Sequence, residues 1–89
     1  MHVELYTKSD CVYCTMTKDL LNKKKISFTE NKLDEDFARE YLLERYPSAR
    51  AYPIVVVDGY MIGGYDQLNT MILLEEQLID NRKLLNEGM

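Results

Sequence analysis

Apolar and polar side chains alternate along two short stretches in the first third of the chain, and between them apolar side chains recur every three or four residues. The alternation predicts strands at about residues 2–6 and 26–30. The longer period predicts an amphipathic helix over about residues 12–24, for which Ser9 and Asp10 are good N-cap residue types. We therefore expect the chain to begin with a strand, a helix and a second strand.

The middle of the chain predicts a second helix followed by a hairpin. Asp34 can cap this helix, which should end near Pro47 because proline disfavours helical geometry in the residue before it. The run Pro53–Val57 is rich in β-branched residues, which is typical of a buried strand. Asp58-Gly59 is a strong signal for a two-residue turn, so a fourth strand should follow directly.

The pair Gly63-Gly64 should interrupt regular secondary structure, and a last helix is expected to start at Tyr65 or Asp66 and to run toward Asn86. We expect four of its apolar side chains to pack on the sheet: Met71, Leu74, Leu78 and Leu85. The element order is then βαβαββα, in a single domain that covers residues 1–89. This α/β order predicts the thioredoxin fold, a four-stranded mixed sheet flanked by three helices.

The composition excludes several classes of partner. The net charge is −4, and the one basic cluster, Lys23–Lys25, is expected to be a solvated helix end. Binding to nucleic acid or to an acidic membrane depends on clustered positive charge, so neither is expected. No signal peptide is visible, and the longest apolar runs are too short to span a membrane. We therefore expect a cytoplasmic monomer.

The two cysteines of the chain, Cys11 and Cys14, are separated by two residues. This spacing alone fits a redox-active dithiol or half of a zinc site. A zinc site needs four ligands, and His2 is the only other histidine or cysteine in the chain. We therefore expect no metal site within one chain, although a metal shared between two chains stays open. In a reducing cytoplasm the pair is expected to be catalytic.

The predicted helix start gives the two cysteines different properties. Cys11 would lie at the helix N-terminus, where unpaired N–H groups and the helix dipole favour a thiolate. Lys8 would add to this effect and Asp10 would oppose it. Cys14 would lie one turn inside the helix, where burial disfavours the charged form. We expect Cys11 to attack a substrate disulfide and Cys14 to resolve the resulting mixed disulfide.

Three motifs together resemble the glutaredoxin family, most closely its small dithiol members from bacteria and phages. They are Cys11-Val12-Tyr13-Cys14, Tyr52-Pro53 before a strand, and Gly63-Gly64-Tyr65-Asp66 before the last helix. The resemblance implies a glutathione-dependent thiol–disulfide oxidoreductase that reduces protein disulfides and glutathionylated proteins. Glutathione would be a co-substrate, no cofactor would be bound, and ribonucleotide reductase would be one recipient of electrons.

The resemblance also implies a glutathione site. Lys8 would contact the glycyl carboxylate, and Tyr13 would pack against the tripeptide. Tyr52 would hold the cysteinyl part through its main chain, before a cis peptide bond to Pro53. The turn formed by Gly63, Gly64 and Tyr65 would offer N–H groups to the γ-glutamyl carboxylate. Asp66 would accept from the γ-glutamyl ammonium, cap the helix, or do both.

The sequence departs from the family pattern, which leaves alternatives open. Val12 replaces the usual proline, and Ala51-Tyr52 replaces Thr-Val before the second proline. Arg39 and Arg50 are the candidates for a second cation at the glycyl carboxylate, and Arg50 is the closer of the two to Pro53 in sequence. The alternative functions are a redoxin reduced by thioredoxin reductase, an iron–sulfur cluster carrier, and a binding module without activity.

Overall fold

The computed structural model describes the backbone of residues 1–87 and the side chains of residues 1–78. The elements follow one another in the expected order βαβαββα. Their bounds are β1 Val3–Thr7, α1 Val12–Lys23, β2 Phe28–Lys32, α2 Arg39–Arg45, β3 Ile54–Val57, β4 Tyr60–Gly63 and α3 Tyr65–Glu87.

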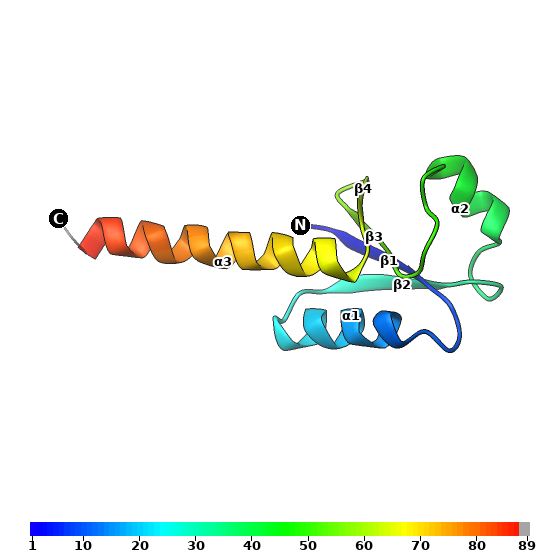
Figure 1. Cartoon of the computed structure of the whole chain (residues 1–89), viewed down its shortest axis with the longest axis horizontal. Helices are drawn as coiled ribbons and strands as arrows, with labels where there is room; N and C mark the ends of the chain where they lie inside the picture. Colours follow the sequence, from blue (N-terminus) through cyan, green and yellow to red (C-terminus); the bar gives the residue numbers. More distant parts are fainter. Residues whose placement is uncertain (88–89) are drawn as a thin grey trace.

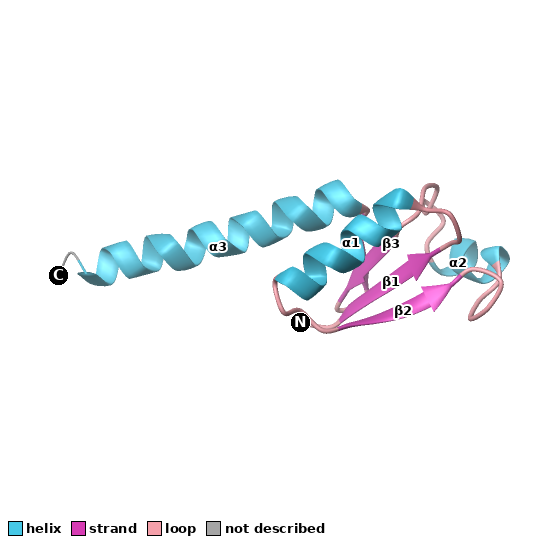
Figure 2. Cartoon of the chain, turned by 90° about the horizontal axis from the view of Figure 1, so that it is seen from below, coloured by secondary structure: helices cyan, strands magenta, loops and turns pink. Residues whose placement is uncertain are grey.

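The four strands form one mixed sheet in the order β2-β1-β3-β4 (Figures 1 and 2). β1 and β2 are parallel and are joined through α1, whereas β3 pairs antiparallel with both β1 and β4. A parallel pair needs such a crossover, while β3 and β4 need only the short turn at Asp58-Gly59. The predicted thioredoxin fold, a four-stranded mixed sheet with three helices, is therefore confirmed.

The two central strands are buried on both faces of the sheet. Alternate residues of a strand point to opposite faces, so β1 and β3 contribute to two separate cores. The first core joins the sheet to α1 and α3 and contains Val3, Leu5, Leu21, Val55, Leu68 and Ile72. The second core joins the sheet to α2 and contains Tyr6, Leu42, Ala49, Ile54 and Val56. The helices thus cover both faces.

Two segments start later than the sequence pattern predicted. Just after the end of α1, Lys25 adopts the left-handed region (φ 59°), and the N–H of Ile26 donates to the carbonyl oxygen of Leu21 at 2.9 Å. Ile26 is thus part of the helix stop, and β2 begins two residues later. Asp34 is also not a helix cap. It lies in a turn (φ 67°) closed by a hydrogen bond from its N–H to the carbonyl oxygen of Phe37.

Among the described side chains of α3, those that pack on the sheet lie in the first part of the helix. Leu68 and Ile72 are buried and Met71 is partly buried, but Leu74 and Leu78 are 55% and 54% exposed. The expectation that Leu74 and Leu78 pack on the sheet is therefore wrong, and the side chain of Leu85 lies outside the described residues. The reason is geometric, because the straight helix runs past the end of the sheet (Figures 1 and 2). No helix among the residues described is apolar enough over sufficient length to cross a membrane.

A polar contact fixes α1 against the edge of the sheet. The carboxylate of Glu30 on β2 accepts hydrogen bonds from Thr7 Oγ1 at 2.7 Å and from Lys18 Nζ at 3.2 Å. Burial by itself would raise the pKa of Glu30. The hydrogen bonds from Thr7 and Lys18 outweigh that effect and hold the pKa below its usual value. The charged form of Glu30 is therefore the one that stabilises this contact.

The packing of α3 predicts different effects for two leucines of the same helix. Leu68→Ala removes a fully buried side chain, so it should lower the free energy of unfolding by about 2–5 kcal/mol. Leu74→Ala, the matched control, should change it by less than about 0.5 kcal/mol because that side chain is half exposed. Urea unfolding followed by circular dichroism measures both. Equal losses would contradict the assignment of α3 contacts.

The Glu30 contact predicts a pH-dependent contribution to stability. The pKa of Glu30 is lower in the folded state than in the unfolded state, so the charged carboxylate stabilises the fold at any pH above the unfolded-state pKa. This stabilisation is lost as the pH falls through the folded-state pKa. Glu30→Gln should therefore lower the melting temperature most near neutral pH, and the difference from wild type should shrink below about pH 4. Glu44→Gln, an exposed carboxyl on α2, is the control. A difference for Glu30→Gln that is constant from neutral to acidic pH would contradict this reasoning.

Candidate functional site

Cys11 is itself the N-cap of α1. Its side chain accepts a hydrogen bond from the N–H of Cys14, with 3.1 Å between nitrogen and sulfur. Neither Ser9 nor Asp10 caps the helix, contrary to the sequence-based expectation. Asp10 adopts a left-handed conformation (φ 52°) that turns the chain from β1 into the helix, and aspartate tolerates this conformation better than most residues do.

The two cysteines are joined by a disulfide and differ strongly in exposure. Cys14 is 2% exposed, whereas Cys11 is partly exposed and lies at the positive end of the helix dipole. Once the disulfide is reduced, the hydrogen bond that the Cys11 sulfur accepts from the N–H of Cys14 would favour the thiolate form of Cys11. The side chain of Cys14 is almost completely shielded from solvent. The structure thus makes Cys11 the accessible nucleophile and Cys14 the enclosed partner.

Six of the residues assigned to glutathione by resemblance lie around one cavity of about 220 Å³. They come from three separate segments of the chain and are Tyr13, Tyr52, Pro53, Gly64, Tyr65 and Asp66. The peptide bond between Tyr52 and Pro53 is cis. The rings of Tyr13 and Tyr65 lie 6.1 Å apart between their centroids. The cavity is therefore bordered by the start of α1, the start of β3 and the start of α3.

The start of α3 approaches β3 so closely that a side chain at Gly64 would not fit without a shift. A Cβ at Gly64 would lie 3.2 Å from the backbone oxygen of Pro53. Gly63 adopts φ 129°, a conformation that L-residues with side chains rarely adopt. The two glycines thus allow the helix N-terminus to lie directly beside the cis proline, which a tight turn alone would not require.

The first turn of α3 is only partly available to a ligand. The N–H of Gly64 donates to Oε1 of Gln67 at 2.9 Å, so it is already occupied. Sequence reasoning gave Gln67 no role, although its position three residues after the glycine is typical of a side chain that caps a helix. Within residues 1–78, no group accepts from the N–H of Tyr65 or Asp66, and no N–H donates to the exposed Asp66 carboxylate. Asp66 therefore does not cap the helix.

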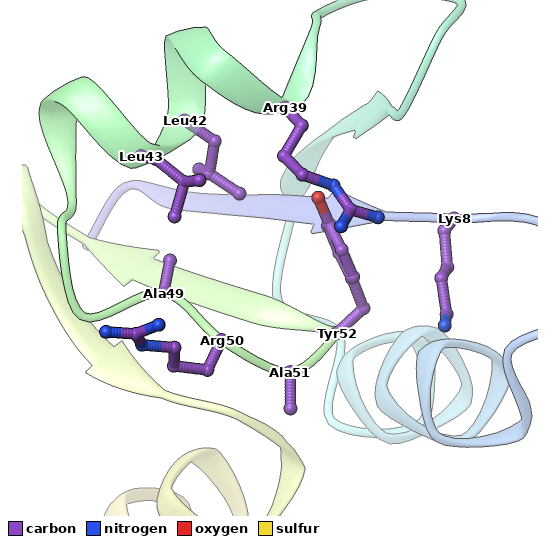
Figure 3. Close-up of a pocket in the computed structure, with 8 residues that line it drawn as sticks. All are labelled: Lys8, Arg39, Leu42, Leu43, Ala49, Arg50, Ala51 and Tyr52. Carbon is purple, nitrogen blue, oxygen red and sulfur yellow. The ribbon is translucent and has the colours of Figure 1, made fainter.

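A second cavity, of about 500 Å³, lies between α2 and the segment before Pro53 (Figure 3). Lys8 Nζ lies 5.9 Å from the centroid of the Tyr52 ring. Figure 3 shows Arg39 reaching toward the same ring from α2, whereas Arg50 points away from Lys8 on the other side of Ala51. The structure therefore separates the two arginines that the sequence could not distinguish. Arg39 and Lys8 lie at one end of the cavity and Arg50 at the other.

A third cavity, of about 580 Å³, lies on the other side of the disulfide. Cys11, Cys14, Lys18 and Glu30 all contribute to its walls, and Lys8 lines this cavity as well as the previous one. Among the described residues, Lys8 is thus the cation that borders both of these cavities. Within the described part of the chain, no three His, Cys, Asp or Glu side chains lie close enough together to hold a metal ion.

Comparison with known proteins identifies the family. The glutaredoxin family model matches residues 3–62. Glutaredoxin 3 of Escherichia coli K12 is 36% identical over 67 residues, which are 75% of this chain and 81% of that protein. The structure of reduced E. coli glutaredoxin aligns with a TM-score of 0.69 at 25% identity, over 88% of this chain and 98% of that one.

A buckwheat glutaredoxin–glutathione complex has the same fold, with a TM-score of 0.68 at 23% identity, over 88% of this chain and 73% of that one. The family match covers both cysteines, Tyr13 and the cis proline. The chain therefore belongs to the glutaredoxin family, and with its Cys11–Cys14 pair it is a thiol–disulfide oxidoreductase.

Proposed function

We propose that the protein uses glutathione to reduce protein disulfides and glutathione mixed disulfides. The observation that carries this proposal is the cavity lined by the cis proline, three tyrosines and the N-terminus of α3. One of these tyrosines, Tyr13, is two residues from Cys11. A generic disulfide reductase needs only the dithiol. A site for a γ-glutamyl group needs hydrogen-bond donors for its carboxylate and an acceptor for its ammonium side by side, and the start of α3 is suited to supply both.

Each polar group of glutathione has a complementary group in this arrangement. The N–H groups of Tyr65 and Asp66 are suited to the γ-glutamyl carboxylate, and the carboxylate of Asp66 is suited to the ammonium. The main chain of Tyr52 can pair with the cysteinyl part as an added strand. Lys8 and Arg39, at the end of the second cavity nearest to Tyr52, are suited to the glycyl carboxylate.

The reaction follows from the different exposure of the two cysteines. The Cys11 thiolate attacks one sulfur of a substrate disulfide, forms a mixed disulfide and releases the other sulfur as a thiolate. Cys14 then loses its proton and attacks Cys11, which releases the second substrate thiolate and leaves the Cys11–Cys14 disulfide. Two glutathione molecules return the pair to the dithiol and leave as glutathione disulfide. Two electrons thus pass from glutathione to the substrate.

The setting of this reaction is proposed from the sequence. A reducing cytoplasm would supply the glutathione that the cycle consumes. Ribonucleotide reductase is the recipient that the family resemblance suggests. A redoxin driven by thioredoxin reductase would share the dithiol but would not need residues at the start of α3 that bind a γ-glutamyl group.

A coupled assay tests the use of glutathione. Wild-type protein should reduce the mixed disulfide of glutathione and 2-mercaptoethanol when glutathione, glutathione reductase and NADPH are present, measured as NADPH oxidation. Cys11→Ser should abolish this activity because it removes the attacking thiolate. Turnover with thioredoxin reductase in place of the glutathione system, and none with glutathione, would reject the proposal.

The second cysteine predicts a separation of two activities. Cys14→Ser should lose reduction of an intramolecular protein disulfide by about 100-fold or more, because no second thiol releases the mixed disulfide. It should keep part of its activity on the glutathione mixed disulfide, which needs one thiol only. Insulin reduction and the coupled assay measure the two. Full insulin reduction by Cys14→Ser would show that Cys14 is not the resolving thiol.

A further inference from the structure

The cavity between α2 and the segment before Pro53 carries an unusual balance of charge for this protein. The chain has a net charge of −4, yet the cavity is lined by three cations, Lys8, Arg39 and Arg50, and by no carboxylate. Within the part of the chain whose side chains are described, none of the three forms an ion pair with an acidic side chain. Their charge is therefore available to a partner.

Glutathione, bound as proposed above, would occupy only one end of this cavity. Lys8 and Arg39 lie beside Tyr52, whereas the far end is formed by Arg50, Leu43 and Ala49 (Figure 3). Ala49 is buried, and Leu43 is 37% exposed, so this end has an apolar wall beside a guanidinium. A tripeptide anchored at the start of α3 has no further group to place there.

A polypeptide substrate would extend farther than glutathione does. Ala51 and Tyr52 line both this cavity and the cavity at the start of α3, so the two are adjoining parts of one surface. A chain that pairs with the main chain of Tyr52 while its cysteine is bonded to Cys11 can continue along this surface toward Arg50.

We propose that the far end of this cavity binds the segment that flanks the target cysteine in a protein substrate, and that this segment is acidic. An aspartate or glutamate of the substrate would pair with Arg50, and a neighbouring apolar side chain would lie on Leu43 and Ala49. We thereby specify which protein substrates the proposed disulfide reductase would favour. This preference depends on the disulfide reductase activity of the chain and not on the use of glutathione.

The physical consequence is selectivity among protein substrates. Charges at the rim of a binding site act mainly on association and on discrimination between partners, and salt screens them. If Arg50 were only a solvated surface cation, its charge would have a small and similar effect on the rate constants of all substrates. The proposal instead requires an effect whose sign follows the charge of the substrate.

Three peptides with the same disulfide loop and acidic, neutral or basic flanks test this. The pre-reduced protein reduces each one in a single turnover, without glutathione, and the second-order rate constants are compared. Wild type should prefer the acidic over the basic peptide by about fivefold at low salt, the scale of an exposed ion pair, and by less at about 200 mM salt. Arg50→Glu should remove or reverse this preference, and Arg50→Lys should keep it.

Lys23→Glu is the matched control. It makes the same change of charge on an exposed side chain at the C-terminal end of α1, far along the helix from Cys11. It should leave unchanged the ratio of the rate constants for the acidic and the basic peptide. Equal rates of wild type on all three peptides, or an equal loss of preference in Lys23→Glu, would overturn the proposal. Thermal unfolding of each variant checks that the fold is retained. Failure of the coupled glutathione assay with a normal peptide preference would reject the proposed function and leave this inference intact.

Discussion

The burial of β1 and β3 on both faces of the sheet is the constraint from which the site follows. Their antiparallel register places Tyr6, near the end of β1, opposite Ile54, the first residue of β3. The next pair places Val55 opposite Gly63, the last residue of β4. The end of β1, the start of β3 and the end of β4 therefore meet at one end of the sheet. Cys11 lies in the segment that follows β1, and Pro53 directly precedes β3. The first residues of α3 follow the end of β4.

Two helix N-termini point to this same end of the sheet. α1 presents the N–H of Cys14 to the sulfur of Cys11, and Tyr65 and Asp66, the first residues of α3, line the cavity beside Pro53. The chemistry of the family passes through sulfur anions, and its proposed co-substrate carries carboxylates. An acidic chain can thus offer a locally positive site without a large excess of lysine and arginine, because part of the field comes from the backbone.

Much of this arrangement could be predicted from the sequence, because strand alternation, the Asp58-Gly59 turn and the spacing of the cysteines are local signals. The differences arise where tertiary contacts decide. Asp34 suits a helix cap, but hydrogen bonds across its turn hold it in another conformation. Arg39 and Arg50 look alike in sequence, and only the path of the chain around Ala51 separates them. Leu74 has helical spacing, but the length of the sheet determines whether it finds a partner.

The overhang of α3 has a consequence for how the molecule behaves in solution. The molecule measures 54 × 23 × 18 Å, so one axis is more than twice either of the others. An elongated particle has more friction with water than a sphere of equal mass. A single copy of the chain should consequently elute early from a sizing column and tumble anisotropically, and its elution volume would overstate its mass. Sedimentation equilibrium or light scattering, which do not depend on shape in this way, are the appropriate measures of its oligomeric state.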